Sequence, residues 1–289
     1  MIVSASYRTD IPAFYGDWFA ARLRAGYAMV RNPYGSADYR VELDADAVDG
    51  FVFWTRNAAP FRSVLDHLAA DDRPFVIQFT ATGYPRMLEA GVIDAEMAVA
   101  QLRDLARRFG ARRLIWRYDP IVMTDGTDRD WHRRQFAGLA AALETSVDEV
   151  VISFAEIYRK SRRNLDRAAA RHGFQWHDPA AVEKQALCRE LADCAAGHGM
   201  TLSVCSQAAL TPAGIAAARC IDVQRLSDVA GRPLAGKTKG NRPGCLCAES
   251  RDIGSYDSCP QGCCYCYAVA DRDRAKAFLA NHDPTSPRL

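Results

Sequence analysis

Short runs of apolar, β-branched and aromatic residues punctuate the chain at intervals. Most of these runs are continuous rather than alternating with polar residues, which is typical of parallel strands buried on both faces. The pattern predicts strands at Ile2–Tyr7, Phe51–Thr55, Phe75–Thr80, Arg113–Tyr118, Glu149–Phe154, Thr201–Cys205 and Asp252–Tyr256.

Between these runs, apolar residues recur with helical spacing. After Asp94, a favourable N-cap residue, Leu102, Leu105 and Phe109 share one helix face, and Gly110 ends the pattern. Further helices are predicted at 131–143, from Asp178-Pro179 onward, and over Asp271–Ala280. Alternating strands and helices indicate an α/β fold with a parallel sheet. Six strands and one more near Asp252–Tyr256 suggest an incomplete (β/α) TIM-like barrel.

The composition of the chain changes near residue 219. Residues 1–218 are expected to form the partial barrel, and residues 219–289 a cysteine-rich segment that completes the same domain. A polar, glycine-containing loop over residues 231–244 leads into the cysteines. This segment is too short to form an independent core.

The composition is that of a globular protein. Of 289 residues, 49% are hydrophobic and 25% charged, which excludes a disordered polymer, and the net charge of +2 gives no general attraction to nucleic acid or membranes. No apolar run reaches 18 residues, and charges at Arg8 and Asp10 interrupt any signal-like N-terminus. We therefore expect a cytoplasmic protein that does not contact a membrane.

The cysteines carry the clearest chemical signal. None of the ten precedes Cys188, and six lie within the 22 residues from Cys245 to Cys266. Thiols stay reduced in the cytoplasm, so such clustering favours metal binding over disulfides.

Three cysteines have the spacing of an iron–sulfur ligand set. Cys259, Cys263 and Cys266 form C-x3-C-x2-C, with Tyr265 before the last cysteine. Three thiolates can hold three irons of a cubane cluster and leave the fourth iron open for chemistry.

This motif resembles that of the radical S-adenosylmethionine enzymes, in the Cys-Tyr-Cys-Tyr form of spore photoproduct lyase-like members. The resemblance implies a [4Fe–4S] cluster, S-adenosylmethionine bound near Tyr265, hydrogen abstraction from an unknown substrate, and a flavodoxin- or ferredoxin-like electron donor. Over nearly its full length the chain also looks like a bacterial family known as domain of unknown function 1848. The segments that carry this likeness are 6–12, 116–121 and 252–257.

One feature departs from the superfamily pattern. Its motif usually follows the first strand of the barrel, whereas here only 23 residues follow Cys266. A circularly permuted order, with Asp252–Tyr256 as the first strand, would accommodate the difference.

Other cysteines suggest a second site. Cys205, Cys220, Cys245 and Cys247 are candidates for a second iron–sulfur cluster or a structural zinc, with ordinary buried thiols as the alternative. A zinc-ribbon-like set would instead combine Cys245 and Cys247 with Cys263 and Cys266. Three further cysteines are interpreted as structural or spare: Cys188, Cys194 and Cys264.

Polar residues at the carboxyl ends of strands are candidates for the active site. Arg8, Asp10, Arg117 and Asp119 are the proposed catalytic groups, and Arg117 is also a candidate clamp for a carboxylate or phosphate of the cofactor. The alternative for Arg117 is a salt bridge with Asp10 or Asp119. Other strand-end residues selected by the same rule are Thr55, Arg56, Gln78, Thr80 and Glu156.

Two other functions remain open on the sequence. One is a zinc-stabilised α/β binding or regulatory protein. The other is a nucleic-acid repair or modification protein, suggested by basic runs such as 159–163. The balanced total charge favours solvated helix faces for these runs, so a nucleic-acid partner is disfavoured.

Overall fold

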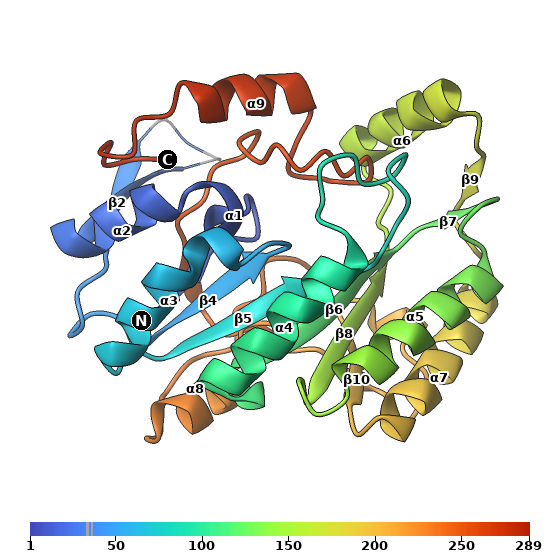
Figure 1. The fold of residues 1–289 in the computed structure, drawn as a ribbon, viewed down its shortest axis with the longest axis horizontal. Coiled ribbons are helices and arrows are strands. Elements are labelled where there is room, and N and C mark those ends of the chain that lie inside the picture. The colour runs from blue at the N-terminus through green and yellow to red at the C-terminus, as the bar shows by residue number, and fades with distance from the viewer. Residues whose placement is uncertain (33–34, 36) are drawn as a thin grey trace.

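A single eight-stranded sheet forms the centre of the computed structural model, which describes residues 1–32, 35 and 37–289 (Figure 1). Every neighbouring pair of strands is parallel, and the order is β11-β10-β8-β6-β5-β4-β1-β12. The α/β fold with a parallel sheet is confirmed, and within the described part of the chain this sheet does not close into a barrel: β11 and β12 are its edges. Its strands are β1 (Ile2–Ala5), β4 (Gly50–Thr55), β5 (Phe75–Thr80), β6 (Leu114–Ile121), β8 (Glu149–Phe154), β10 (Thr201–Val204), β11 (Ala216–Ala217) and β12 (Ser250–Asp252).

Strand β12 pairs with β1 although almost the whole chain lies between them. The sequence pattern predicts this strand at Asp252–Tyr256, but it ends at Asp252. The Asp252 carboxylate accepts hydrogen bonds from the backbone N–H of Tyr7 and of Gly254, and a Cβ at Gly254 would lie 2.0 Å from Ser6 Oγ. The chain turns at this close approach and cannot continue as a strand.

One face of the sheet is covered by helices. Phe51 and Phe53, two residues apart on β4, both point into this layer, where they pack with Phe19 and Phe61. The apolar runs are continuous because neighbouring residues of each strand point to opposite faces of the sheet, and both faces are buried. The covering helices are α2 (Gly16–Ala25), α3 (Arg62–Ala70), α4 (Ala95–Phe109), α5 (Arg129–Leu143) and α7 (Ala181–Gly197).

The opposite face carries a smaller apolar layer. Val52, Val76 and Ile115 point into it from three strands, and Leu226 of α8 (Val223–Ala230) packs against them. Four cysteines belong to this layer: Cys205, Cys220, Cys245 and Cys247.

The remaining elements lie around the ends of the sheet. Helix α9 begins after Asp271, whose carboxylate accepts from two backbone N–H groups of the first turn, as its sequence predicts. Helix α7 begins at Ala181, later than the Asp178-Pro179 signal predicts: the Glu183 carboxylate accepts from the backbone N–H of Ala180 at the start of the helix, and Asp178 pairs with Lys184. The other elements are α1 (Ile11–Phe14), α6 (Arg159–His172), α9 (Arg272–Ala280), the hairpin β2 (Tyr27–Arg31) and β3 (Asp38–Glu42), the pair β7 (Met123–Thr124) and β9 (Trp176–His177), and the 3-10 turns Ala59–Phe61, Ala111–Arg113 and Ala208–Leu210.

Among the described residues, none of the helices combines the length and the apolar character needed to cross a membrane.

Candidate functional site

The loop with the C-x3-C-x2-C spacing, residues 258–267, follows β12 and lies at the carboxyl end of the sheet. Three separate parts of the chain hold it. The Tyr15 hydroxyl donates to the carbonyl of Ser258 at 2.6 Å, the Arg272 Nε donates to the carbonyl of Pro260 at 3.0 Å, and the backbone N–H of Gly91 donates to the carbonyl of Gln261 at 2.7 Å. The loop is therefore anchored through its backbone carbonyls, and these three contacts do not involve its thiols.

Cys259, Cys263 and Cys266 lie close enough to one another for their charges to interact. Burial raises the pKa of all three thiols, that of Cys263 to about 12. Groups around them act in the opposite direction: the backbone N–H of Ala268 donates to Cys266 Sγ at 3.3 Å, and the Arg56 guanidinium favours the thiolates of Cys263 and Cys266. The set resembles a ligand site whose protons are to be replaced by metal.

A buried network of charges supports this loop from below. Arg56 Nη1 lies 2.7 Å from Glu89 Oε1, and Arg56 Nη2 donates to the Tyr265 hydroxyl at 2.7 Å. The hydroxyls of Tyr265 and Thr82 both donate to Glu89. Tyr265, expected to contact a cofactor, thus has its hydroxyl fixed within the protein.

Asp10 links the N-terminal segment to the cysteine loop. Its carboxylate accepts from the backbone N–H of Ala13 and of Arg56 and, at 3.1 Å, from Gln261 Nε2. Burial raises the pKa of Asp10. Its hydrogen bonds position the loop that carries Cys259.

Arg8 has a different partner. Its Nε donates to Asp252 Oδ1 at 2.9 Å, and its Nη2 donates to the Asp252 carbonyl at 2.8 Å. The same carboxylate accepts from the hydroxyls of Ser4 and Ser6. Arg8 therefore joins β1 to β12, and the pairing is invisible to local sequence reasoning because 244 residues separate the partners.

Arg117 and Asp119 face the same side of β6, as their alternation predicts. Arg117 Nη2 lies 2.5 Å from Asp119 Oδ2, so the salt-bridge interpretation with Asp119 is confirmed as a contact. Arg117 Nη1 also donates to Gln78 Oε1 at 3.1 Å and to Cys220 Sγ at 3.1 Å. Its side chain is buried and stacks on Trp54.

Cys205, Cys220, Cys247 and Cys245 come together in a chain of thiols beside Arg117. The Sγ atoms of Cys220 and Cys205 are 3.5 Å apart, and hydrogen bonds continue from Cys220 to Cys247 and from Cys247 to Cys245. The hydrogen bond from Cys247 lowers the pKa of Cys245 to about 5. As placed, no three His, Cys, Asp or Glu side chains of the described residues surround a common point as metal ligands do.

The chain matches a known protein family over most of its length. The model of the family described as domain of unknown function (DUF1848) matches residues 2–268. The chain belongs to this family. No curated protein and no solved structure matches it significantly.

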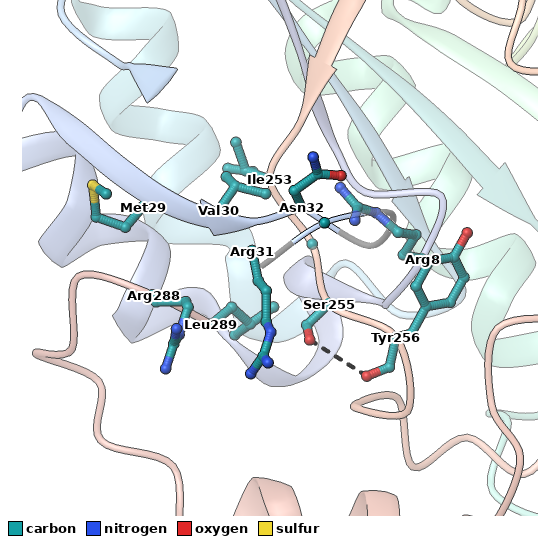
Figure 2. A pocket seen from close by; sticks show the side chains of 12 residues that line it. Arg8, Met29, Val30, Arg31, Asn32, Ile253, Ser255, Tyr256, Arg288 and Leu289 are labelled. Carbon is teal, nitrogen blue, oxygen red and sulfur yellow. Dashed lines mark hydrogen bonds between the residues drawn. The ribbon is translucent and has the colours of Figure 1, made fainter. Parts of the chain in front are cut away.

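A pocket of this DUF1848 member lies beside the β1–β12 edge, outside both cysteine groups (Figure 2). It has a volume of about 330 Å³ and is lined by segments around residues 29–32 and 253–256 and by the C-terminal Arg288 and Leu289. Arg8 and Tyr256 border it, with the Arg8 guanidinium 5.6 Å from the Tyr256 ring centroid. The pocket is thus separated from the thiols but shares Arg8 with the edge of the sheet.

Sequence reasoning missed several residues around the cysteine loop and strand β12. Glu89 lies in the irregular segment between β5 and α4, where no periodicity marks it, yet it is the counter-ion of Arg56. Gln261 lies inside the motif, but nothing local shows that its amide meets Asp10. Asp252 heads a predicted strand, and only its pairing with β1 reveals its role. Arg56, in contrast, was among the candidates selected because they follow the carboxyl end of a predicted strand, and it does lie in this site.

Proposed function

We propose that this protein is a radical S-adenosylmethionine enzyme whose [4Fe–4S] cluster is held by Cys259, Cys263 and Cys266. The observation that carries the proposal is that these three thiols lie within range of one another's charges on one anchored loop. The loop lies at the carboxyl edge of a parallel sheet, the edge where α/β enzymes place their chemistry. Three thiolates satisfy three irons and leave one open.

When bound and reduced, the cluster on Cys259, Cys263 and Cys266 would supply one electron for reductive cleavage of S-adenosylmethionine and so the means of abstracting a hydrogen atom from the substrate. The chain's own residues prepare this site. Arg56 offsets the negative charge of the thiolates, and Glu89 with Tyr265 keeps Arg56 in place. Asp10 holds Gln261 and thereby the turn between Cys259 and Cys263.

We further propose that the sheet is a circularly permuted partial barrel. The strand order β12-β1-β4-β5-β6-β8-β10-β11 supports this, because it is consecutive except that the last strand of the chain comes first. In such an order, the loop after β12 corresponds to the loop after a first barrel strand.

The decisive experiment is reductive cleavage of S-adenosylmethionine by protein reconstituted with iron and sulfide without oxygen. With dithionite as reductant, the wild type should form 5′-deoxyadenosine and methionine and contain roughly four irons at this site. Cys259→Ala, Cys263→Ala and Cys266→Ala should abolish the products, because each removes one of the three ligands. Cys264→Ala is the matched control in the same loop and should retain iron and cleavage.

Two results would contradict the assignment. A colourless reconstituted wild type with zinc on this loop would exclude a cluster there. Loss of iron in Cys264→Ala but not in Cys259→Ala would show that the ligand spacing is wrong.

We also propose that a small acidic electron-donor protein of flavodoxin or ferredoxin type docks on α6. This helix carries five arginines and one lysine against a single aspartate. It lies beside the cysteine loop (Figure 1), since Arg163 Nη2 donates to the carbonyl of Ala270 and Asn164 Nδ2 to that of Val269. A basic surface next to a redox centre suits an acidic partner and speeds its association.

Charge reversal on α6 tests this docking. Arg159→Glu/Arg162→Glu should slow flavodoxin-driven cleavage severalfold at low salt and leave dithionite-driven cleavage unchanged. Arg24→Glu/Arg232→Glu makes the same charge change on α2 and beyond α8, and should affect neither reaction. Equal rates for both variants would exclude the docking site, and salt-dependent binding of DNA or RNA to α6 instead would favour the nucleic-acid alternative.

A further inference from the structure

The four cysteines beside Arg117 come from three separate parts of the chain. Cys205 follows β10, Cys220 follows β11, and Cys245 and Cys247 lie in the loop before β12. Three of them are buried, and Cys245 is partly exposed. Packing alone rarely gathers four thiols into one contiguous group, and a cytoplasmic thiol group of this kind is characteristic of metal binding.

The distances between the sulfur atoms indicate which kind of centre fits. The 3.5 Å between the Sγ atoms of Cys220 and Cys205 is far longer than a disulfide bond of about 2.05 Å. It is close to the separation of about 3.8 Å between two ligands of a tetrahedral ion with metal–sulfur bonds of about 2.3 Å. A cubane cluster places each thiolate on a different iron and therefore holds the sulfurs farther apart.

The surroundings favour thiolates over neutral thiols. Arg117 Nη1 lies 3.1 Å from Cys220 Sγ, and Arg242 Nη2 lies 3.6 Å from Cys205 Sγ. The backbone N–H of Ile221 donates to Cys247 Sγ at 3.4 Å. Four thiolates around Zn²⁺ leave a net charge of roughly −2, and the two guanidinium groups place positive charge beside two of the sulfurs.

Both guanidinium groups also have carboxylate partners. Arg117 pairs with Asp119, and Arg242 Nη1 lies 3.3 Å from Glu156 Oε2. Each guanidinium therefore bridges a carboxylate and a sulfur, the geometry in which an arginine orients a ligand from outside the metal.

We propose that Cys205, Cys220, Cys245 and Cys247 form a structural zinc site in the smaller apolar layer, on the face of the sheet opposite the five covering helices. Beside these ligands, the segment that follows β11 meets the segment that leads into β12: the backbone N–H of Ala248 donates to the carbonyl of Ile221. The four thiols lie in a chain and do not surround one point among the described residues, so zinc would draw them together. It would replace the thiol–thiol hydrogen bonds by four bonds to one ion and would connect the segments that follow β10 and β11 to the segment that precedes β12. This proposal stands apart from the radical chemistry of the other cysteine group.

The test is the zinc content of the purified protein. The wild type should carry roughly one zinc per chain, and the Cys259→Ala/Cys263→Ala/Cys266→Ala variant should keep it. Cys245→Ala/Cys247→Ala should lose it and unfold at a lower temperature. Cys188→Ala/Cys194→Ala, which removes two thiols from α7, is the matched control and should retain zinc.

A second measurement uses the wild type alone, in case the double variant fails to fold. Protein grown with Co²⁺ in place of zinc should show the intense sulfur-to-cobalt absorption and ligand-field bands of a tetrahedral four-thiolate site. Absence of zinc from the wild type, or unchanged zinc in Cys245→Ala/Cys247→Ala, would overturn the proposal. Loss of iron and sulfide from that variant, instead of zinc, would also overturn it and would indicate a second iron–sulfur cluster.

The two proposals fail separately. Zinc without S-adenosylmethionine cleavage would contradict only the radical enzyme, and cleavage by a zinc-free protein would contradict only the zinc site.

Discussion

The ion pair between Arg56 and Glu89 gives a direct test of how the cysteine loop is supported. The two side chains are 11% and 2% exposed, and the carboxylate also accepts from the hydroxyls of Thr82 and Tyr265. Glu89→Gln keeps the shape of the side chain but removes its charge. Arg56 would then be a buried cation facing a neutral amide.

Removing one partner of a buried ion pair costs about 3–5 kcal/mol, because the remaining charge stays desolvated without compensation. Arg56 retains a little contact with solvent, so we expect a loss near the lower end, about 3 kcal/mol in the free energy of unfolding. The loop above the pair should also hold its cluster less firmly, which would lower the iron content after reconstitution.

Urea unfolding of the protein without iron measures the loss, and iron analysis follows reconstitution. Glu249→Gln is the matched control: this carboxylate and its partner Lys239 are both exposed to solvent, so the change should cost little stability. Tyr265→Phe and the double variant complete a cycle whose coupling energy should be about 0.5–3 kcal/mol, because both side chains meet at one carboxylate. A loss in Glu89→Gln no larger than in the control, or strict additivity with Tyr265→Phe, would refute this account of the loop.

Two further predictions concern backbone strain and protonation. Gly262 has φ +78°, and a Cβ there would lie 2.5 Å from Arg272, so Gly262→Ala should lower stability and iron content; Gly26→Ala, at φ +75° with open space around it, should lower stability less and leave iron unchanged. Burial lowers the pKa of His132 to about 4. As pH falls from 6.5 toward 4, the unfolded chain therefore takes up a proton at this residue and the folded chain does not. The free energy of unfolding should fall by about 3 kcal/mol over that window. The advantage of wild type over His132→Gln in urea unfolding should therefore shrink as pH falls, and a constant difference would contradict it.

The strands of the sheet could be predicted because burial on both faces leaves a mark in the local sequence. β5 and β8 have the predicted bounds, since five consecutive residues of each strand are buried and most of them are apolar. The hairpin of β2 and β3 could not be found in this way. In β3, polar and apolar residues alternate, and in β2 only every second residue is buried, so neither strand is a run of buried residues.

The cysteine groups were predictable as sets but not as geometries. Spacing alone indicates Cys259, Cys263 and Cys266, because a short loop brings its own residues together. Spacing also left open whether Cys245 and Cys247 join these three. The structure places Cys245 and Cys247 in the smaller apolar layer with Cys205 and Cys220, whereas Cys263 packs in a separate apolar cluster. Such a choice depends on the order of strands in the sheet, which no local pattern contains.

The position of β12 explains why both cysteine groups depend on long-range pairing. The strand ends the loop that carries Cys245 and Cys247 and begins the loop that carries Cys259. Its Asp252 is fixed by Ser4, Ser6 and Arg8 of the first segment of the chain. If this pairing opens, the anchored loop at the carboxyl edge loses its register with Asp10, and the thiols on the other face lose their tie to β12. The buried Asp252 carboxylate thus couples the geometry of the two sites, because a single strand supplies a boundary to each.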